Sequence, residues 1–128
     1  MGKKIIKSSP SKVDRRQQKK LVYDYPATDS GMLAGADETH KPDLKTSKQL
    51  IKLFEHKISG FESAIDLAGG VGRTTSKLLI PRFNQVDLQD VNLHYIRLAK
   101  KMYPQIKNVF CCDIKDMTFK KQFDCIWI

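Results

Sequence analysis

The sequence predicts an α/β fold organised as a doubly wound parallel sheet, and three observations support this prediction. Short apolar runs typical of strands alternate with helical segments of about ten residues. A glycine-rich bend follows the first such run in AIDLAGGVGRTT, residues 64–75. An acid, Asp90, ends the next run, QVDLQD. Strand, glycine bend, helix, strand and acid is how such a sheet holds an adenosine-containing cofactor at its carboxyl edge.

Three helices are expected in the folded part. The first covers residues 44–58 before Gly60, with one apolar face made of Leu44, Leu50, Leu53, Phe54 and Ile58. The second covers residues 73–80 and ends before Pro81, and the third covers residues 93–103 and ends before Pro104. Proline disfavours helical geometry in the residue before it, so both ends are well marked.

Four strands are expected, at residues 63–67, 85–89, 108–112 and 123–128. The last one, ending in Ile126, Trp127 and Ile128, is predicted to lie at the centre of the sheet with nothing after it to cover its apolar side chains. A sheet truncated after its fourth strand indicates the N-terminal part of a longer protein, or a truncated product of one.

The positive charge is concentrated at the N-terminus. Residues 1–20 hold eight Lys or Arg against one acid, whereas the whole chain has a net charge of +9. Their low hydrophobicity predicts a basic disordered tail, either an arm for nuclear localisation or nucleic acid, or a solvated extension. Residues 21–128 form the folded part, in which 21–43 is a lid over a ligand or a cover for the sheet edge, and 44–128 holds the sheet and helices.

Other classes are excluded by composition. No apolar run reaches the roughly 18 residues of a membrane span, and no secretory signal is present. Cys111, Cys112 and Cys125 lack the spacing of a metal site and are expected to be reduced thiols of an intracellular protein.

The glycine bend discriminates between cofactors. A dinucleotide fingerprint requires a third glycine where this chain has Thr75, and no Gly-Lys-Ser/Thr follows, which excludes a P-loop. The run DLAGGVG, by contrast, begins with an acid, Asp66, at the end of the first expected strand. It resembles motif I of the S-adenosyl-L-methionine-dependent methyltransferases, which have a Rossmann-like class I fold, although Ala68 replaces the first glycine of that motif.

A closer resemblance is carried by YPATDSGMLAG, DLAGGVGRTTSKLLIPRF, VDLQDVN, NVFCCDIKDMT and FDCIWI. Over about residues 21–128 the chain is similar to the protein N-terminal methyltransferases. That family transfers methyl groups from S-adenosyl-L-methionine to the α-amino group of proteins beginning Xaa-Pro-Lys. The resemblance implies that protein N-termini are partners of this chain and that it carries the cofactor-binding half.

The resemblance also implies roles for single residues. Asp66 would organise the amino-acid end of the cofactor, Arg73 would reach its carboxylate, and Asp90 would hold the ribose hydroxyls. Leu33 would lie near the substrate peptide. The full set of implied cofactor-binding residues is Asp66, Ala68, Gly70, Gly72, Arg73, Asp90, Val91, Asn92, Ile114 and Lys115.

No catalytic residue is predicted within the chain, because the family's catalytic groups lie beyond the last expected strand. His56 and His94 are expected to face solvent, and His40 is expected in a loop. The family's Tyr-Trp pair is replaced by Leu21-Val22-Tyr23. Two alternatives to an enzyme stay open: a non-catalytic relative that binds cofactor weakly or not at all, and a nucleotide- or nucleic-acid-binding module that uses the basic tail. A cytoplasmic or nuclear location without membrane contact is expected.

Overall fold

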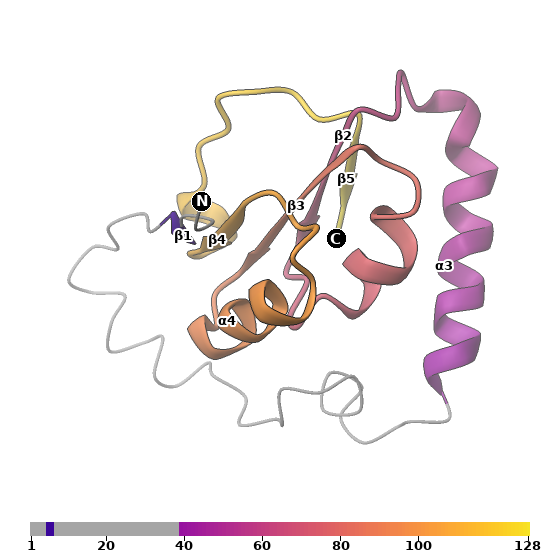
Figure 1. Ribbon diagram of the computed structural model, residues 1–128. Helices are drawn as coiled ribbons and strands as arrows, with labels where there is room; N and C mark the ends of the chain where they lie inside the picture. The colour runs from indigo at the N-terminus through magenta and orange to yellow at the C-terminus, as the bar shows by residue number, and fades with distance from the viewer. Residues whose placement is uncertain (1–4, 7–38) are drawn as a thin grey trace.

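A computed structural model describes residues 5–6 and 39–128; the predictions for Leu33 and for most of the basic tail and lid fall outside this range. The described strands form one sheet, all parallel, in the order β1-β4-β3-β2-β5 (Figure 1). They are β1 (Ile5–Ile6), β2 (Ser63–Leu67), β3 (Gln85–Asp90), β4 (Val109–Cys111) and β5 (Cys125–Trp127). The predicted parallel α/β sheet is therefore confirmed. β1 was not expected, because it lies within the segment predicted to be a disordered tail.

The strand order reverses beside β2. From β2 the chain moves outward to β3 and then to β4, after which it returns to place β5 on the opposite side of β2. Ala64 pairs with Val86 of β3 on one side and with Cys125 of β5 on the other. Ligands of open parallel sheets bind beyond the carboxyl ends of the strands at such a reversal. The glycine bend begins at this point.

Helices pack against the face of the sheet that contains Val86 and Leu88. Ile51 together with Leu78 and Leu79 covers Val86, whereas Ile96 and Ala99 cover Leu88. In Figure 1 the η3 turn lies between α3 and the strands. The helical elements are α3 (His40–Phe54), η2 (Glu55–Lys57), η3 (Thr75–Leu79), α4 (Leu93–Met102) and η4 (Ile114–Asp116). Of these, η3 has π-type geometry, and Ile80 N donates to Thr75 O at 2.9 Å.

The first helix differs from its prediction at both ends and in its buried face. It starts at His40, so the end of the predicted lid segment belongs to it, and it ends before η2. Leu44 and Ile51, two turns apart, are its buried residues, because the contact with η3 and the sheet is only one stripe wide. The predicted apolar face was wrong at three positions that are 46%, 66% and 51% exposed, Leu50, Leu53 and Phe54.

The last strand also differs from its prediction. β5 lies at an edge of the described sheet rather than at its centre, and it pairs with β2 alone. Its Ile126 is 56% exposed, and Ile128, which follows it, is 81% exposed. Both apolar side chains are therefore exposed to solvent at the edge of the sheet that β5 forms.

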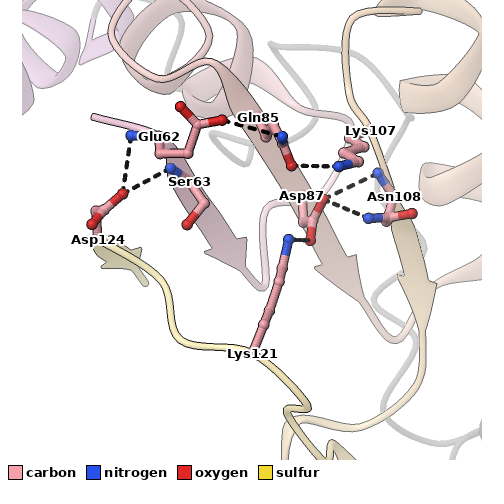
Figure 2. A network of polar contacts seen from close by, with 8 residues as sticks. All are labelled: Glu62, Ser63, Gln85, Asp87, Lys107, Asn108, Lys121 and Asp124. Carbon is pink, nitrogen blue, oxygen red and sulfur yellow. Dashed lines mark hydrogen bonds and ion pairs between the residues drawn. The ribbon is translucent and has the colours of Figure 1, made fainter. Parts of the chain in front are cut away.

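Polar contacts join the strands near their amino ends (Figure 2). The Asp124 carboxylate, just before β5, accepts hydrogen bonds from Ser63 N at 2.9 Å and Glu62 N at 3.0 Å. Asp87 of β3 accepts from Asn108 and forms an ion pair of 3.1 Å with Lys121. These contacts fix the strands at the end opposite the glycine bend.

Among residues 39–128, no helix is both long and apolar enough to cross a membrane. Cys111, Cys112 and Cys125 are all thiols.

Candidate functional site

The bend after β2 turns sharply through residues in left-handed backbone conformations. Ala68, Gly70 and Gly72 have φ values of +56°, +58° and +86°. Gly69 between them has no space for a side chain: a Cβ there would lie 2.2 Å from Leu88 Cδ1 and 2.8 Å from Asp66 Cγ. The backbone of the bend therefore packs tightly against Leu88 of β3 and Asp66 of β2, and only glycine fits at position 69.

Asp66 is a buried acid directly beneath the bend. It is 2% exposed, and its Oδ2 accepts a 2.6 Å hydrogen bond from the Thr75 hydroxyl. Burial raises the pKa of Asp66 to about 6, and the negative charge of Asp90 adds to the effect. The hydrogen bond from Thr75 and the positive charge of Arg73 act in the opposite direction. A cation bound nearby would stabilise the ionised carboxylate.

A cavity of about 330 Å³ opens between the bend, α3 and β5. Four of the predicted residues line it, namely Asp66, Ala68, Gly70 and Arg73. Asp43 of α3 and Trp127 of β5 also contribute to its wall. The cavity thus offers two carboxylates and one guanidinium, a combination suited to a ligand that carries charges of both signs.

Arg73 is held by α3. Its Nη2 donates a 2.5 Å hydrogen bond to Asp43 Oδ2, and its Nη1 lies 3.3 Å from His40 Nδ1. The guanidinium side chain is only 12% exposed. Contrary to the prediction, His40 lies in a helix, and its Nε2 is 3.2 Å from Lys77 Nζ. His56 and His94 are exposed as predicted.

Asp90 connects the end of β3 to the bend. Its Oδ2 accepts from Gly70 N at 2.9 Å and its Oδ1 from Asn92 N at 2.8 Å. Asp90 is 9% exposed, and burial raises the pKa of its carboxyl group. Asn92 in turn caps α4 by accepting from His94 N at 2.9 Å, and Val91 beside it is 42% exposed. This predicted trio therefore forms one turn next to the bend.

The remaining predicted residues are less close to the cavity. Ile114 and Lys115 are exposed in η4, which follows β4 at the same sheet edge, but they do not line the cavity. Gly72 is buried and faces α4: a Cβ there would lie 3.0 Å from the Tyr103 ring. The geometry places Gly72 in the packing of bend against helix rather than in the cavity wall.

Several residues around the glycine bend were not predicted from the sequence. Asp43 and Trp127 line the cavity, yet nothing in their local sequence indicates it, because α3 and β5 meet the bend only in three dimensions. Gln89 is 1% exposed and hydrogen-bonded to Ala68 N. A glutamine within an otherwise buried strand was a signal that its amide has partners.

The described residues offer no metal site, and a second cavity lies apart from the bend. In residues 5–6 and 39–128 no group of three or more His, Cys, Asp or Glu side chains is arranged to bind a metal ion. A larger cavity of about 530 Å³ lies against Asp87, Phe110 and Met117, and none of the predicted site residues lines it.

Most of the chain is similar in sequence to one family of known proteins. Residues 12–128 match the family described as AdoMet dependent proline di-methyltransferase. The chain is 34% identical over 112 residues to N-terminal Xaa-Pro-Lys N-methyltransferase 1 of Bos taurus and 32% identical over 111 residues to that of Homo sapiens. Each match covers 80% of this chain and 50% of the relative, so the chain spans about half the length of the curated relatives it matches.

Solved structures show a similar fold. A SAM-dependent methyltransferase from Leishmania major has a TM-score of 0.74 and 27% identity, covering 80% of this chain and 42% of that one. DesVI of Streptomyces venezuelae has a TM-score of 0.62 at 16% identity, covering 81% of this chain and 43% of that one, and indicates the fold alone.

Proposed function

Because the chain belongs to the AdoMet-dependent proline di-methyltransferase family, we propose that it carries the cofactor-binding half of a protein N-terminal methyltransferase. The methyl donor would be S-adenosyl-L-methionine and the acceptor the α-amino group of a protein N-terminus of the Xaa-Pro-Lys type. The observation that carries the proposal is the cavity beside the glycine bend, which Arg73, Asp66 and Asp43 line together.

The residues of the cavity fit this cofactor. Its amino-acid end has an ammonium and a carboxylate, and the cavity supplies carboxylates for the first and the Arg73 guanidinium for the second. Gly69, which also lines the cavity, allows the bend to pack closely over Asp66 and Leu88, and this places the lining residues Ala68 and Gly70. Asp90 does not line the cavity but is bonded to Gly70, which does, and its carboxylate would use the acceptor positions left beside its backbone partners to hold the ribose hydroxyls.

When bound, the cofactor supplies an electrophilic methyl group on a sulfonium. The residues of this chain then bind and orient: Arg73 and Asp66 hold the amino-acid end, and Asp90 with Val91 and Asn92 holds the ribose side. Ile114 and Lys115, at the same sheet edge, would approach the adenine. Such positioning contributes much of the rate in a transfer between two bound groups.

The acceptor amine must be neutral to attack, and an α-amino group has a pKa of about 7.7–8.0. A neighbouring base would take its proton. We assign this role to no residue among 39–128. We propose that Leu33 contacts the substrate peptide, in line with the family resemblance.

Titration calorimetry of the chain with S-adenosyl-L-methionine tests the cofactor site. Asp90→Ala is expected to weaken binding, because the substitution removes an acceptor that also holds Gly70 N. If both proteins bind equally, or neither binds, the assignment of Asp90 is wrong. Methyl transfer is tested with a peptide beginning Xaa-Pro-Lys and a matched peptide whose α-amino group is acetylated. Labelling of the acetylated peptide would contradict the proposed acceptor.

We further propose a cytoplasmic or nuclear location, supported by the thiol state of the three cysteines and by the basic residues 1–20. Microscopy of a fluorescent fusion with and without residues 1–20 tests it. A secreted or membrane-bound fusion would contradict it.

A further inference from the structure

We propose that Gln89 is a positioning residue that holds the glycine bend in its ligand-binding conformation. It would do so by joining the loop after β2 to the loop after β4. The inference rests on the proposed cofactor site, but it concerns a residue that would not itself touch the cofactor.

Three hydrogen bonds converge on Gln89. Its side-chain Oε1 accepts from Ala68 N at 2.9 Å, and its Nε2 donates to the main-chain oxygen of Cys112. Its own main-chain oxygen accepts from Gly69 N at 3.0 Å. Gln89 therefore fixes two consecutive amides of the bend, one through its side chain and one through its backbone.

The bend has a particular need for such a contact. Ala68 has a φ of +56°, a left-handed conformation that is strained for an L-residue with a Cβ. Ala68 lines the cavity, so any relaxation of its backbone would move the cavity wall. A hydrogen bond donated by Ala68 N to a side chain that cannot move opposes that relaxation.

Gln89 is well placed to stay fixed. It is 1% exposed in β3, the central strand of the described sheet, with Leu67 of β2 and Phe110 of β4 as its register partners. Its amide donor is occupied by Cys112, directly before the loop of η4. A buried amide with both ends satisfied is held in one orientation. It therefore couples the loop proposed to lie near the adenine to the bend proposed to hold the amino-acid end.

The test compares Gln89→Met, which keeps the length of the side chain and loses both hydrogen bonds, with Asp87→Asn. Asp87 lies two residues earlier on the same face of β3, is also 1% exposed, and contacts Asn108 and Lys121 rather than the bend. Both variants are expected to lower the midpoint of thermal unfolding. Only Gln89→Met is expected to weaken S-adenosyl-L-methionine binding in calorimetry, by about tenfold.

Ala68→Gly supplies the rescue. Glycine adopts positive φ without strain, so the bend would no longer depend on Gln89. In the Ala68→Gly background, Gln89→Met is expected to weaken binding less than twofold. Equal losses in both backgrounds, or an equal loss in Asp87→Asn, would show that Gln89 acts only through general stability and would overturn the proposal.

Amide hydrogen exchange of the ligand-free chain separates this proposal from the cofactor assignment. Gln89→Met is expected to speed exchange at Ala68 N more than at Gly69 N, because Gly69 N keeps its backbone acceptor. Unchanged exchange at Ala68 overturns the positioning role. Faster exchange there in a chain that binds no cofactor supports the contact and overturns the proposed function instead.

Discussion

Arg73, in the first turn after the glycine bend, donates a 2.5 Å hydrogen bond to Asp43 in the first turn of α3. The two residues are 30 positions apart in sequence and both line the same cavity. This ion pair attaches α3 to the bend. It also holds the guanidinium at the cavity wall, where its remaining N–H donors can bind a ligand. Asp43 is 45% exposed and Arg73 12%, so the arginine is the better fixed of the two.

Arg73→Gln is expected to weaken S-adenosyl-L-methionine binding by ten- to a hundredfold. A hydrogen bond to a charged group contributes roughly 1.5–3 kcal/mol, and glutamine can supply only a neutral donor. Calorimetry measures the loss. Arg82→Gln is the matched control, since Arg82 is also half-buried but donates to Leu78 O, away from the cavity. Equal affinity losses in the two variants would contradict the assignment of Arg73.

The raised pKa of Asp66 makes stability depend on pH. Below pH 3.8 the carboxyl is protonated whether the chain is folded or not; between 3.8 and about 6 only the folded chain keeps the proton. The free energy of unfolding should therefore fall as pH rises through this window, by roughly 3 kcal/mol in total. Chemical denaturation at a series of pH values measures it. In Asp66→Asn the slope should shrink, and the ligand-free chain should be more stable at pH 7 than the unsubstituted one.

The same carboxyl should make cofactor binding pH-dependent in the opposite sense. An ammonium favours the ionised form of Asp66, so affinity should fall as pH drops below about 6. Asp66→Asn should bind more weakly and with a flatter pH profile. A profile as steep in Asp66→Asn as in the unsubstituted chain would assign the titration to another group.

The bend tolerates no side chain at Gly69. In Gly69→Ala the new Cβ would meet Leu88 Cδ1 and the Asp66 carboxyl, which are both buried and cannot move away freely. We expect a loss of about 1–3 kcal/mol in the free energy of unfolding, measured by denaturation, and weaker cofactor binding. Gly60→Ala is the control, because its Cβ would lie 3.2 Å from Asp124 Oδ1, where a small shift suffices. An equal effect of the two substitutions would mean that the bend adapts.

Much of the fold could be predicted because its signals are local. The β2 bounds were predicted to the residue, since apolar character ends abruptly at the bend. The buried face of α3 could not be predicted, because the apolar side chains at Leu50, Leu53 and Phe54 satisfy helical spacing just as well as the stripe that packs. Which face of α3 is buried depends on where η3 packs against it, and the local sequence of α3 does not encode that contact.

The residues of the candidate site likewise fall into those that the sequence predicts and those that it does not. Asp66 and Asp90 lie near the carboxyl ends of their strands and the glycines follow the first of these strands, a pattern that the sequence displays directly. Asp43 and Trp127 come from elements that meet the bend only after folding, so their spacing carries no signal. The edge position of β5 likewise depends on the strand order, which no single segment encodes.

The contacts of Asp124 should determine how firmly β5 is held. Its carboxylate accepts from Ser63 N and Glu62 N (Figure 2) and also from the Ser59 hydroxyl. These hydrogen bonds, the one from Ser63 foremost, lower the pKa of Asp124. Because the folded chain favours the ionised form, this stabilisation is present above pH 3.8 and is lost as pH falls through the lowered value.

Asp124→Ala should speed exchange of the backbone amides that pair β2 with β5 at neutral pH. Asp124→Asn, which keeps one acceptor oxygen, should have a smaller effect. Because Trp127 of β5 lines the cavity, Asp124→Ala should also weaken cofactor binding, although it lies at the other end of the strand. Exchange as slow in Asp124→Ala as in the unsubstituted chain would show that the backbone ladder alone holds β5.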